Sequence, residues 1–359
     1  MNDPLSSAII RGSAAPRDLV ARLASDAWID GWWHRPGVPT PQWDDYVDAI
    51  AKRRLRGAQF AEVRDALVVW REDPTERALL GMPVGRIEAV VPPIAPLPIL
   101  VEDGDDDLPP ARLGDDAVAA MTMALQRATA NAFTDGLSYL VADVDARAVE
   151  QVWAFGRAGF DMIDGTLHFG RRIAGTDHST PATAVGGVTI EMATPADADD
   201  VASAIQFAWD RYHVDPMLPS DGANALYRAW IRQACQGQGT DVAWVARDAD
   251  GILGFAAGAI DPLARDLLGV PTLQITLAST APRARRQGIG RALATQAIQW
   301  AANEGLSAID VAASIRNIAA ARTYESAGFR LVASRLTMRS WVSLEDASRA
   351  PATTAPGPS

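Results

Sequence analysis

Two segments of the 359-residue sequence resemble each other along their whole length. DGLSYLVADVDARAVEQVWAFGRAGF (135–160) aligns without gaps with EGLSAIDVAASIRNIAAARTYESAGF (304–329), so that GLS, an arginine and AGF recur at a constant offset. Self-similarity of this kind indicates repeated structural units. Each copy has the pattern of a short strand, a loop, a helix ended by glycine at the position after its C-cap, and an aromatic residue that starts another strand. The sequence therefore predicts two related α/β domains in tandem.

Composition divides the chain around these repeats. The segment IAGTDHSTPATAVGG, residues 173–187, is small, polar and punctuated by proline and glycine, which is typical of a linker. We therefore expect a helical extension with a partly disordered start at 1–60, a first domain at 61–172, a second domain at 188–343 and a disordered tail at 344–359.

The charge and residue counts exclude several kinds of site. A net charge of -11 argues against a nucleic-acid-binding surface. The single Cys235 and four scattered histidines lack a ligand spacing, so we expect no metal site. No apolar run approaches membrane-spanning length and MNDPLSSAII is unlike a signal peptide, so we expect a cytoplasmic protein without a membrane partner. The acidic run at 102–107 is expected to be a solvated loop.

A glycine- and arginine-rich turn distinguishes the second domain from the first. In RARRQGIGRALATQAI (283–298), Gly288 and Gly290 allow backbone N–H groups to approach an anion at the start of a helix, where the helix dipole adds positive charge. Three arginines lie nearby in the sequence: Arg285, Arg286 and Arg291. The aligned residues of the first copy, DAVAAMT, contain neither glycine nor arginine. An anion site at this turn is therefore expected only in the second domain.

The glycine spacing excludes two familiar nucleotide sites. The pattern GxxxxGK[ST] is absent, and GxGxxG fails because Leu293 occupies the third glycine position. A nucleoside triphosphatase or a Rossmann dinucleotide site is therefore not expected.

Pro282, Arg285, Gly288 and Gly290 follow a strand pattern, and Asn317 and Tyr324 lie in NIAAARTYESAGF downstream. This ordered set, over residues 187–343, resembles the GCN5-related N-acetyltransferase (GNAT) superfamily. The resemblance implies two tandem domains, each a mixed, mostly antiparallel twisted sheet flanked by helices, with the first domain a degenerate copy. It also implies acetyl-CoA as co-substrate.

The resemblance assigns roles to individual residues. It implies that the pyrophosphate of coenzyme A is held by a loop of Arg286, Gln287, Gly288, Ile289, Gly290 and Arg291, with Arg285 beside it. It further implies that a strand end splayed from the next strand contacts the acetyl and pantetheine groups through Ala278, Ser279 and Thr280. Asn317 matches the cofactor-facing asparagine, and Tyr324 matches the tyrosine near the thioester sulfur.

Acyl transfer to an amine needs a neutral nucleophile, donors for the developing oxyanion and a proton for the leaving thiolate. A tyrosine pKa of about 10 keeps Tyr324 protonated at neutral pH, so it can donate that proton. The base is left open between an ordered water relay and these side chains: Asp210, His213, Asp215, Asp241 and Asp310. Cys235 has no visible His/Asp relay, so direct transfer in a ternary complex is expected.

The acceptor is less constrained. The order of segments over roughly residues 65–343 resembles dTDP-fucosamine acetyltransferases, which implies a nucleotide-linked amino sugar. Its phosphates would need cations, for which the candidates are Arg211, Arg228 and Arg232, although surface charge is the simpler interpretation of each. The extension has no counterpart in that family, and core packing is the usual role of its tryptophans: Trp28, Trp32, Trp33 and Trp43.

Two other functions fit parts of the sequence. The motif is also close to ribosomal-protein alanine acetyltransferases, which implies a peptide N-terminus or an antibiotic amine as acceptor; the tandem architecture argues against the peptide. A non-catalytic acetyl-CoA-binding module is the third hypothesis, and the joint presence of Gly288, Gly290, Asn317 and Tyr324 argues against it. The sequence leaves open whether the chain forms a homodimer.

Overall fold

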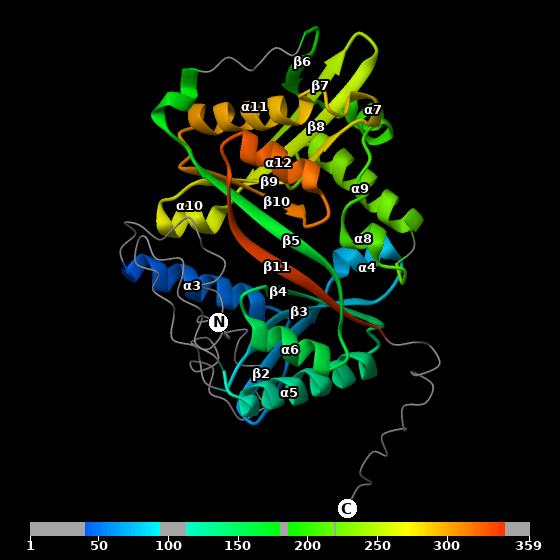
Figure 1. Ribbon diagram of the computed structural model, residues 1–359, viewed down its shortest axis with the longest axis vertical. Helices are drawn as coiled ribbons and strands as arrows, with labels where there is room; N and C mark the ends of the chain where they lie inside the picture. The colour runs from blue at the N-terminus through cyan, green and yellow to red at the C-terminus, as the bar shows by residue number, and fades with distance from the viewer. Residues whose placement is uncertain (1–39, 94–112, 180–185, 219, 342–359) are drawn as a thin grey trace, which may run out of the picture.

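The computed structural model describes residues 40–93, 113–179, 186–218 and 220–341. Eleven strands of these residues form one continuous sheet flanked by helices (Figure 1), which confirms the predicted mixed α/β class. The predicted tail, the acidic run at 102–107 and the tryptophans of the extension before residue 40 lie outside the described residues, as does the side chain of Trp43.

The elements of the first half are α3 (Thr40–Leu55), β1 (Gln59–Val63), β2 (Ala66–Glu72), α4 (Pro74–Leu80), β3 (Val84–Val91), α5 (Asp115–Thr134), β4 (Tyr139–Asp145), α6 (Val149–Arg157) and β5 (Asp161–Arg172). Those of the second half are β6 (Thr189–Met192), α7 (Ala198–Ala204), α8 (Arg211–Val214), α9 (Ser220–Cys235), β7 (Val242–Asp248), β8 (Gly251–Ile260), α10 (Pro262–Leu268), β9 (Thr272–Thr280), α11 (Ile289–Asn303), β10 (Ala308–Ser314), α12 (Ile318–Ser326) and β11 (Arg330–Trp341). Short 3₁₀ turns lie at Gly175–Ser179, Pro195–Asp197 and Pro282–Ala284.

The repeat predicted the helix ends correctly. α6 and α12 each end at an alanine C-cap that is followed by a glycine with left-handed backbone, Gly159 with φ 90° and Gly328 with φ 84°. Glycine adopts this conformation without the steric penalty that other residues meet there. The aromatic residue after each glycine, Phe160 or Phe329, is buried.

The last strands of the two halves are exchanged. The strand order is β1-β2-β3-β4-β11-β5-β10-β9-β8-β7-β6, so β5 lies between β11 and β10, while β11 lies between β4 and β5. Each half contributes one parallel pair, β3 with β4 and β9 with β10, and its other ladders are antiparallel. In Figure 1 the long strands β5 and β11 cross the middle of the molecule, with α11 and α12 above them and α5 and α6 below. The sequence did not predict this exchange.

The first turns of α11 pack closely against strand β8. Gly254 of β8 faces the first turns of this helix, and a Cβ atom at Gly254 would lie 2.8 Å from Ile289 Cγ2 and 2.9 Å from Leu293 Cδ1. Ile289 and Leu293 are both buried in the core that joins β8, β9 and β10. The missing side chain therefore lets the helix lie directly on the sheet. Among the described residues, no helix combines the length and the apolar character needed to cross a bilayer.

Candidate active site

Strands β9 and β10 diverge in the middle of the sheet. Their parallel ladder joins Thr272–Ile275 to Ala308–Val311 and then stops. Beyond that point β9 continues along β8, whereas β10 continues along β5. Ala278, Ser279 and Thr280 lie on the diverging end of β9. Among the described residues, no backbone hydrogen bond joins the two strands across this opening, as inserting a ligand between two strands requires.

The glycine- and arginine-rich turn lies beside this opening. Arg286 and Gly288 both have left-handed backbone, with φ 62° and 83°, and α11 begins directly afterwards. No side chain caps this helix N-terminus, so its first N–H groups point outwards without an intrahelical acceptor. A Cβ atom on Gly290 would lie 3.4 Å from Thr323 Cγ2 and 3.6 Å from Thr280 Oγ1. The first turn of α11 therefore contacts both the end of β9 and α12.

Exposed cations surround the turn. Arg285, Arg286 and Arg291 are exposed, as is Gln287, and within the described part of the chain none of the three guanidinium groups forms an ion pair. Arg283 differs, because its Nη2 lies 2.9 Å from Asp248 Oδ1. Unpaired cations together with free N–H groups at a helix N-terminus form a favourable site for a phosphate-containing ligand.

Helix α12 carries the two remaining predicted site residues. Asn317 is its N-cap, and its Oδ1 accepts a hydrogen bond from Ala320 N at 3.1 Å. Tyr324 is buried between Phe169 and Phe329, with ring centroids 5.7 and 5.8 Å away. Burial raises the pKa of Tyr324 to about 12, so the phenol is protonated at neutral pH. No group among the described residues hydrogen-bonds to its hydroxyl, which is therefore available to donate.

The corresponding opening in the first half is closed. β3 and β4 also diverge after four parallel pairs, Val84–Ile87 with Tyr139–Ala142. Gln151 of α6 spans this gap, and its Nε2 donates to Val90 O at 3.1 Å. Counted from the start of each ladder, Val90 takes the place of Ala278. A side chain of the first half therefore occupies the position that the resemblance assigns to the cofactor in the second.

The first half also lacks the residues that would hold and use an anion. The repeat places Ala148 and Phe155 opposite Asn317 and Tyr324. Helix α5 begins before the position that aligns with the start of α11, and its first turn carries two acidic residues, Asp115 and Asp116. Negative charge at a helix N-terminus disfavours a second anion there. The structure thus gives physical grounds for regarding the first half as degenerate.

Two of the five candidate bases have structural roles. Asp215 is buried, accepts a hydrogen bond from Tyr139 Oη at 2.8 Å and lies 3.2 Å from Arg339 Nε. Asp241 accepts from Ile260 N at 2.7 Å. These contacts hold elements of the fold together.

Asp210 and His213 form a pair. Asp210 caps α8, and its Oδ2 lies 2.9 Å from His213 Nδ1. The imidazole also stacks on Tyr227, with centroids 5.7 Å apart. The loop before this pair is joined to the diverging strand, because Ser279 Oγ donates to Gln206 O at 2.8 Å.

Asp310 lies on β10, one residue before the ladder with β9 ends. Its neighbours Ile309 and Val311 are buried in the core, so the alternation of a strand places Asp310 on the opposite face. Burial, with a smaller contribution from Asp261, raises the pKa of Asp310 to about 7. No described residue pairs with its carboxylate. Asp310 therefore matches a group that exchanges protons near neutral pH.

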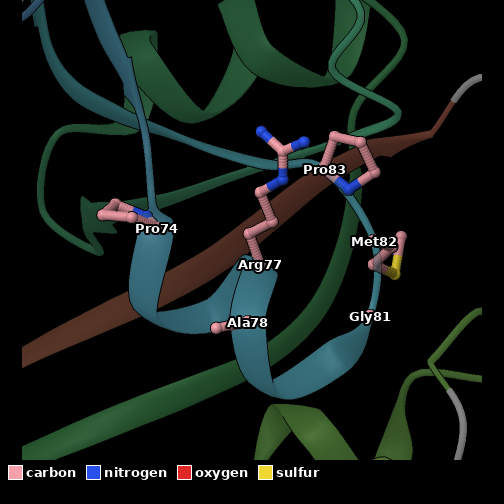
Figure 2. Close-up of a pocket in the computed structure, with 6 residues that line it drawn as sticks. All are labelled: Pro74, Arg77, Ala78, Gly81, Met82 and Pro83. Carbon is pink, nitrogen blue, oxygen red and sulfur yellow. The ribbon is translucent and has the colours of Figure 1, made fainter.

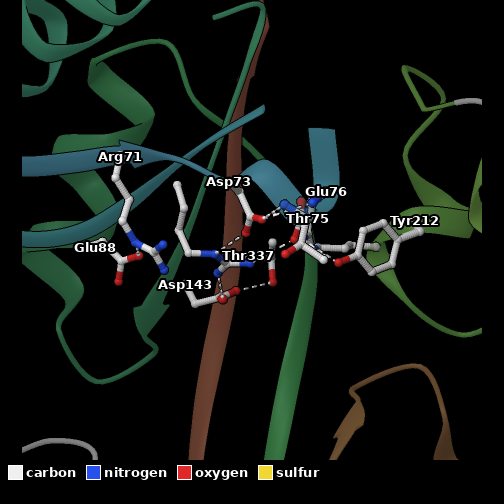
Figure 3. A network of polar contacts seen from close by, with 10 residues as sticks. Arg71, Asp73, Thr75, Glu76, Glu88, Asp143, Tyr212 and Thr337 are labelled. Carbon is white, nitrogen blue, oxygen red and sulfur yellow. Dashed lines mark hydrogen bonds and ion pairs between the residues drawn. The ribbon is translucent and has the colours of Figure 1, made fainter. Parts of the chain in front are cut away.

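Figure 3 shows a polar network between the two halves that the sequence did not predict. Arg211 of α8 is buried and donates to Glu76 of α4, which also accepts from Tyr212 Oη at 2.9 Å. Arg211 is therefore unavailable to the phosphates of a nucleotide. Arg232 pairs with Asp199, its Nε 2.8 Å from Oδ1, and Arg228 is exposed without an ion-pair partner among the described residues.

A separate hollow of about 400 Å³ is lined by α4 and by the turn that leads from α4 to β3 (Figure 2). Its lining includes Arg77 and Met82 and none of the predicted site residues. In the described part of the chain, no three His, Cys, Asp or Glu side chains gather closely enough to hold a metal ion.

A known protein family matches part of the second half of the chain. Residues 204–329 match the model of the acetyltransferase (GNAT) family, a span that includes the turn, Asn317 and Tyr324. A comparison with curated proteins gives no match.

Solved structures of low sequence identity align with this chain. The glucosamine N-acetyltransferase region of a fungal multi-domain GH3 β-N-acetylglucosaminidase aligns with a TM-score of 0.53 and 11% identity, over 90% of this chain and 37% of that one. A tandem GNAT protein from the clavulanic acid biosynthesis pathway aligns with a TM-score of 0.49 and 10% identity, over 90% and 95% of the two chains. A GCN5-related N-acetyltransferase from Kribbella flavida gives 0.48 and 13%, over 83% and 96%. Only the first exceeds a TM-score of 0.5, and at its identity the likeness concerns the fold alone. The similarity to the GNAT family of acetyltransferases therefore concerns residues 204–329, and the solved structure above that TM-score adds a likeness of fold.

Proposed function

We propose that the protein is an N-acetyltransferase that transfers the acetyl group of acetyl-CoA to a primary amine of a small molecule, by direct attack in a ternary complex. The observation that carries this proposal is the opening between β9 and β10 beside the uncapped N-terminus of α11. An extended thioester arm suits the opening, and a pyrophosphate suits the helix N-terminus.

The residues present fit acetyl-CoA. Exposed arginines and free N–H groups of the turn from Arg285 to Arg291 would hold its phosphates, and Gly290 leaves no side chain in the way. The diverging residues Ala278–Thr280 would contact the arm, with Asn317 at the start of α12. Acetyl-CoA supplies an acetyl group activated as a thioester.

Two side chains would transfer protons in the reaction, Asp310 as general base and Tyr324 as general acid. Asp310 would accept the proton that the acceptor nitrogen loses, since a carboxylate with a pKa of about 7 is partly ionised at neutral pH. One bond forms between nitrogen and the acetyl carbon while the carbon–sulfur bond breaks. Tyr324 would donate its phenolic proton to the departing sulfur and regain one from solvent. The net reaction yields an amide and a free thiol.

For the acceptor, we propose a small-molecule amine, with a nucleotide-linked amino sugar as the class favoured by segment order. The pairing of Arg211 with Glu76 removes one of the three cations considered for the nucleotide phosphates. Amino sugars without a nucleotide therefore belong in the same test, together with peptides and antibiotic amines.

Thiol release at saturating acetyl-CoA, measured over that panel, tests the proposal. We expect turnover with one class of amine. Tyr324→Phe should lower kcat by roughly 10² to 10⁴, the usual span for general acid catalysis, without changing the affinity for acetyl-CoA. Binding of acetyl-CoA without turnover on any amine would contradict the proposal that the protein is an enzyme, and would favour a non-catalytic binding module.

A further inference from the structure

The exchanged strand β5 belongs to the first half of the chain but forms part of the site in the second. Its residues Thr166–Arg172 pair with Ala308–Ser314 of β10. Phe169, in the middle of this segment, is 1% exposed and packs its ring against that of Tyr324 at 5.7 Å. The first half therefore supplies one wall around the residue that we propose as the catalytic acid.

β5 also holds the end of the helix that carries Tyr324. Arg171 Nη1 donates to the carbonyl of Ala327, the C-cap residue of α12, at 2.9 Å, and its Nη2 lies 2.7 Å from Asp177 Oδ1. A cation bound to a C-terminal carbonyl satisfies an acceptor that the helix leaves unpaired and complements the helix dipole. Tyr324 lies in the last turn of α12, three residues before this contact.

The exchange of β5 and β11 is reciprocal, so equivalent residues of the two halves can be compared. At the constant offset of the repeat, Met338 of β11 is the counterpart of Phe169, and Phe155 is the counterpart of Tyr324. Met338 and Phe155 lie together in the core of the first half, as Phe169 and Tyr324 do in that of the second. Both pairs are buried in an apolar core, but only the pair in the second half includes a hydroxyl.

Tyr324 depends on such packing for its orientation. Because no described residue hydrogen-bonds to its hydroxyl, the position of the hydroxyl oxygen is set by the ring contacts and by the position of α12. We infer that β5, through Phe169 and Arg171, is a positioning element that aims the Tyr324 hydroxyl at the leaving sulfur. This inference rests on the proposed function and gives the first half a role in the reaction.

A double-mutant cycle in the full-length chain tests the inference. Phe169→Leu and Arg171→Gln should each lower kcat by roughly 10- to 100-fold, as small misplacements of catalytic groups do, with the acetyl-CoA affinity changed less than about twofold. In a Tyr324→Phe background neither substitution should lower kcat further, since they act through the missing hydroxyl.

Two substitutions outside the proposed site serve as controls. Met338→Ala removes a buried side chain from the equivalent position of β11, and Arg157→Gln removes an exposed cation from the last turn of α6. Both should leave kcat within about threefold of wild type. If Arg171→Gln or Phe169→Leu lowers kcat equally with and without the Tyr324 hydroxyl, the two residues are only structural and the inference is wrong. If Tyr324→Phe itself has no effect, the proposed acid fails instead, so the two failures are distinguishable.

Discussion

Asp310 should make the stability of the protein depend on pH in a predictable way. Its pKa is about 7 in the folded chain and about 3.9 in an unfolded one, so the folded state binds the proton more tightly between these values. For a carboxyl group with a raised pKa, stability is fully present below the unfolded value and is lost as pH rises towards the folded value. At 1.36 kcal/mol per pKa unit, the difference amounts to up to about 4 kcal/mol, lost between roughly pH 4 and pH 7 and constant above that.

The assay compares wild type with Asp310→Asn by urea denaturation from pH 4.5 to pH 8.5. Asparagine keeps the shape of the side chain and does not ionise, so this part of the pH dependence should disappear from the variant. The difference in the free energy of unfolding, variant minus wild type, should increase with pH up to about 7 and then level off. A difference that stays constant across the range would show that Asp310 is ionised normally, and would also remove the argument for it as the base.

Three further substitutions or measurements test the packing. Gly254→Ala should cost roughly 1–3 kcal/mol in denaturation and weaken acetyl-CoA binding in calorimetry, because the new Cβ meets Ile289 at 2.8 Å; unchanged affinity would show that α11 need not lie so close to β8. Glu76→Ala should cost about 3–5 kcal/mol by leaving Arg211 buried without its carboxylate, whereas Glu72→Ala, at an exposed pair, should cost about 1 kcal/mol or less; similar costs would refute the burial argument. Because β5 and β11 are exchanged, far-UV circular dichroism and tryptophan fluorescence should report one common unfolding transition, and two separated transitions would contradict interlocked halves.

The sequence predicted the turn before α11 and the ends of two helices because the relevant signals are local. Gly288 and Gly290 indicate a turn and a helix start through backbone geometry alone, and the structure has α11 beginning at the next residue after Gly288. The repeat likewise predicted the glycines that end α6 and α12. The roles of these residues towards acetyl-CoA stay predictions.

The strand exchange could not be predicted from the same evidence. Phe169 and Met338 occupy equivalent positions in strands of equal length, so either pairing would bury a comparable apolar side chain. A period of two specifies which face of a strand is buried and says nothing of which neighbour it pairs with.

Pairs of side chains that lie far apart in the sequence could not be predicted either. Arg211 looked available for phosphate, but its partner Glu76 lies 135 residues earlier in the chain. For Asp310, the pattern IDVAAS places a polar residue between buried ones, which is detectable in the sequence. Its lack of a partner depends on strands β5 and β9, which only the fold brings beside it.

Calorimetric titration of acetyl-CoA into wild type and a Gly288→Glu, Gly290→Glu double variant tests the central claim most directly. Glutamates at these positions place negative charge and bulk at the N-terminus of α11, where we expect the pyrophosphate. The account predicts one binding site per chain in the wild type, since Gln151 closes the opening of the first half, and loss of binding in the variant. Unchanged binding in the variant would show that the turn is not the cofactor site, and two sites per chain would contradict the assignment of binding to the second half alone.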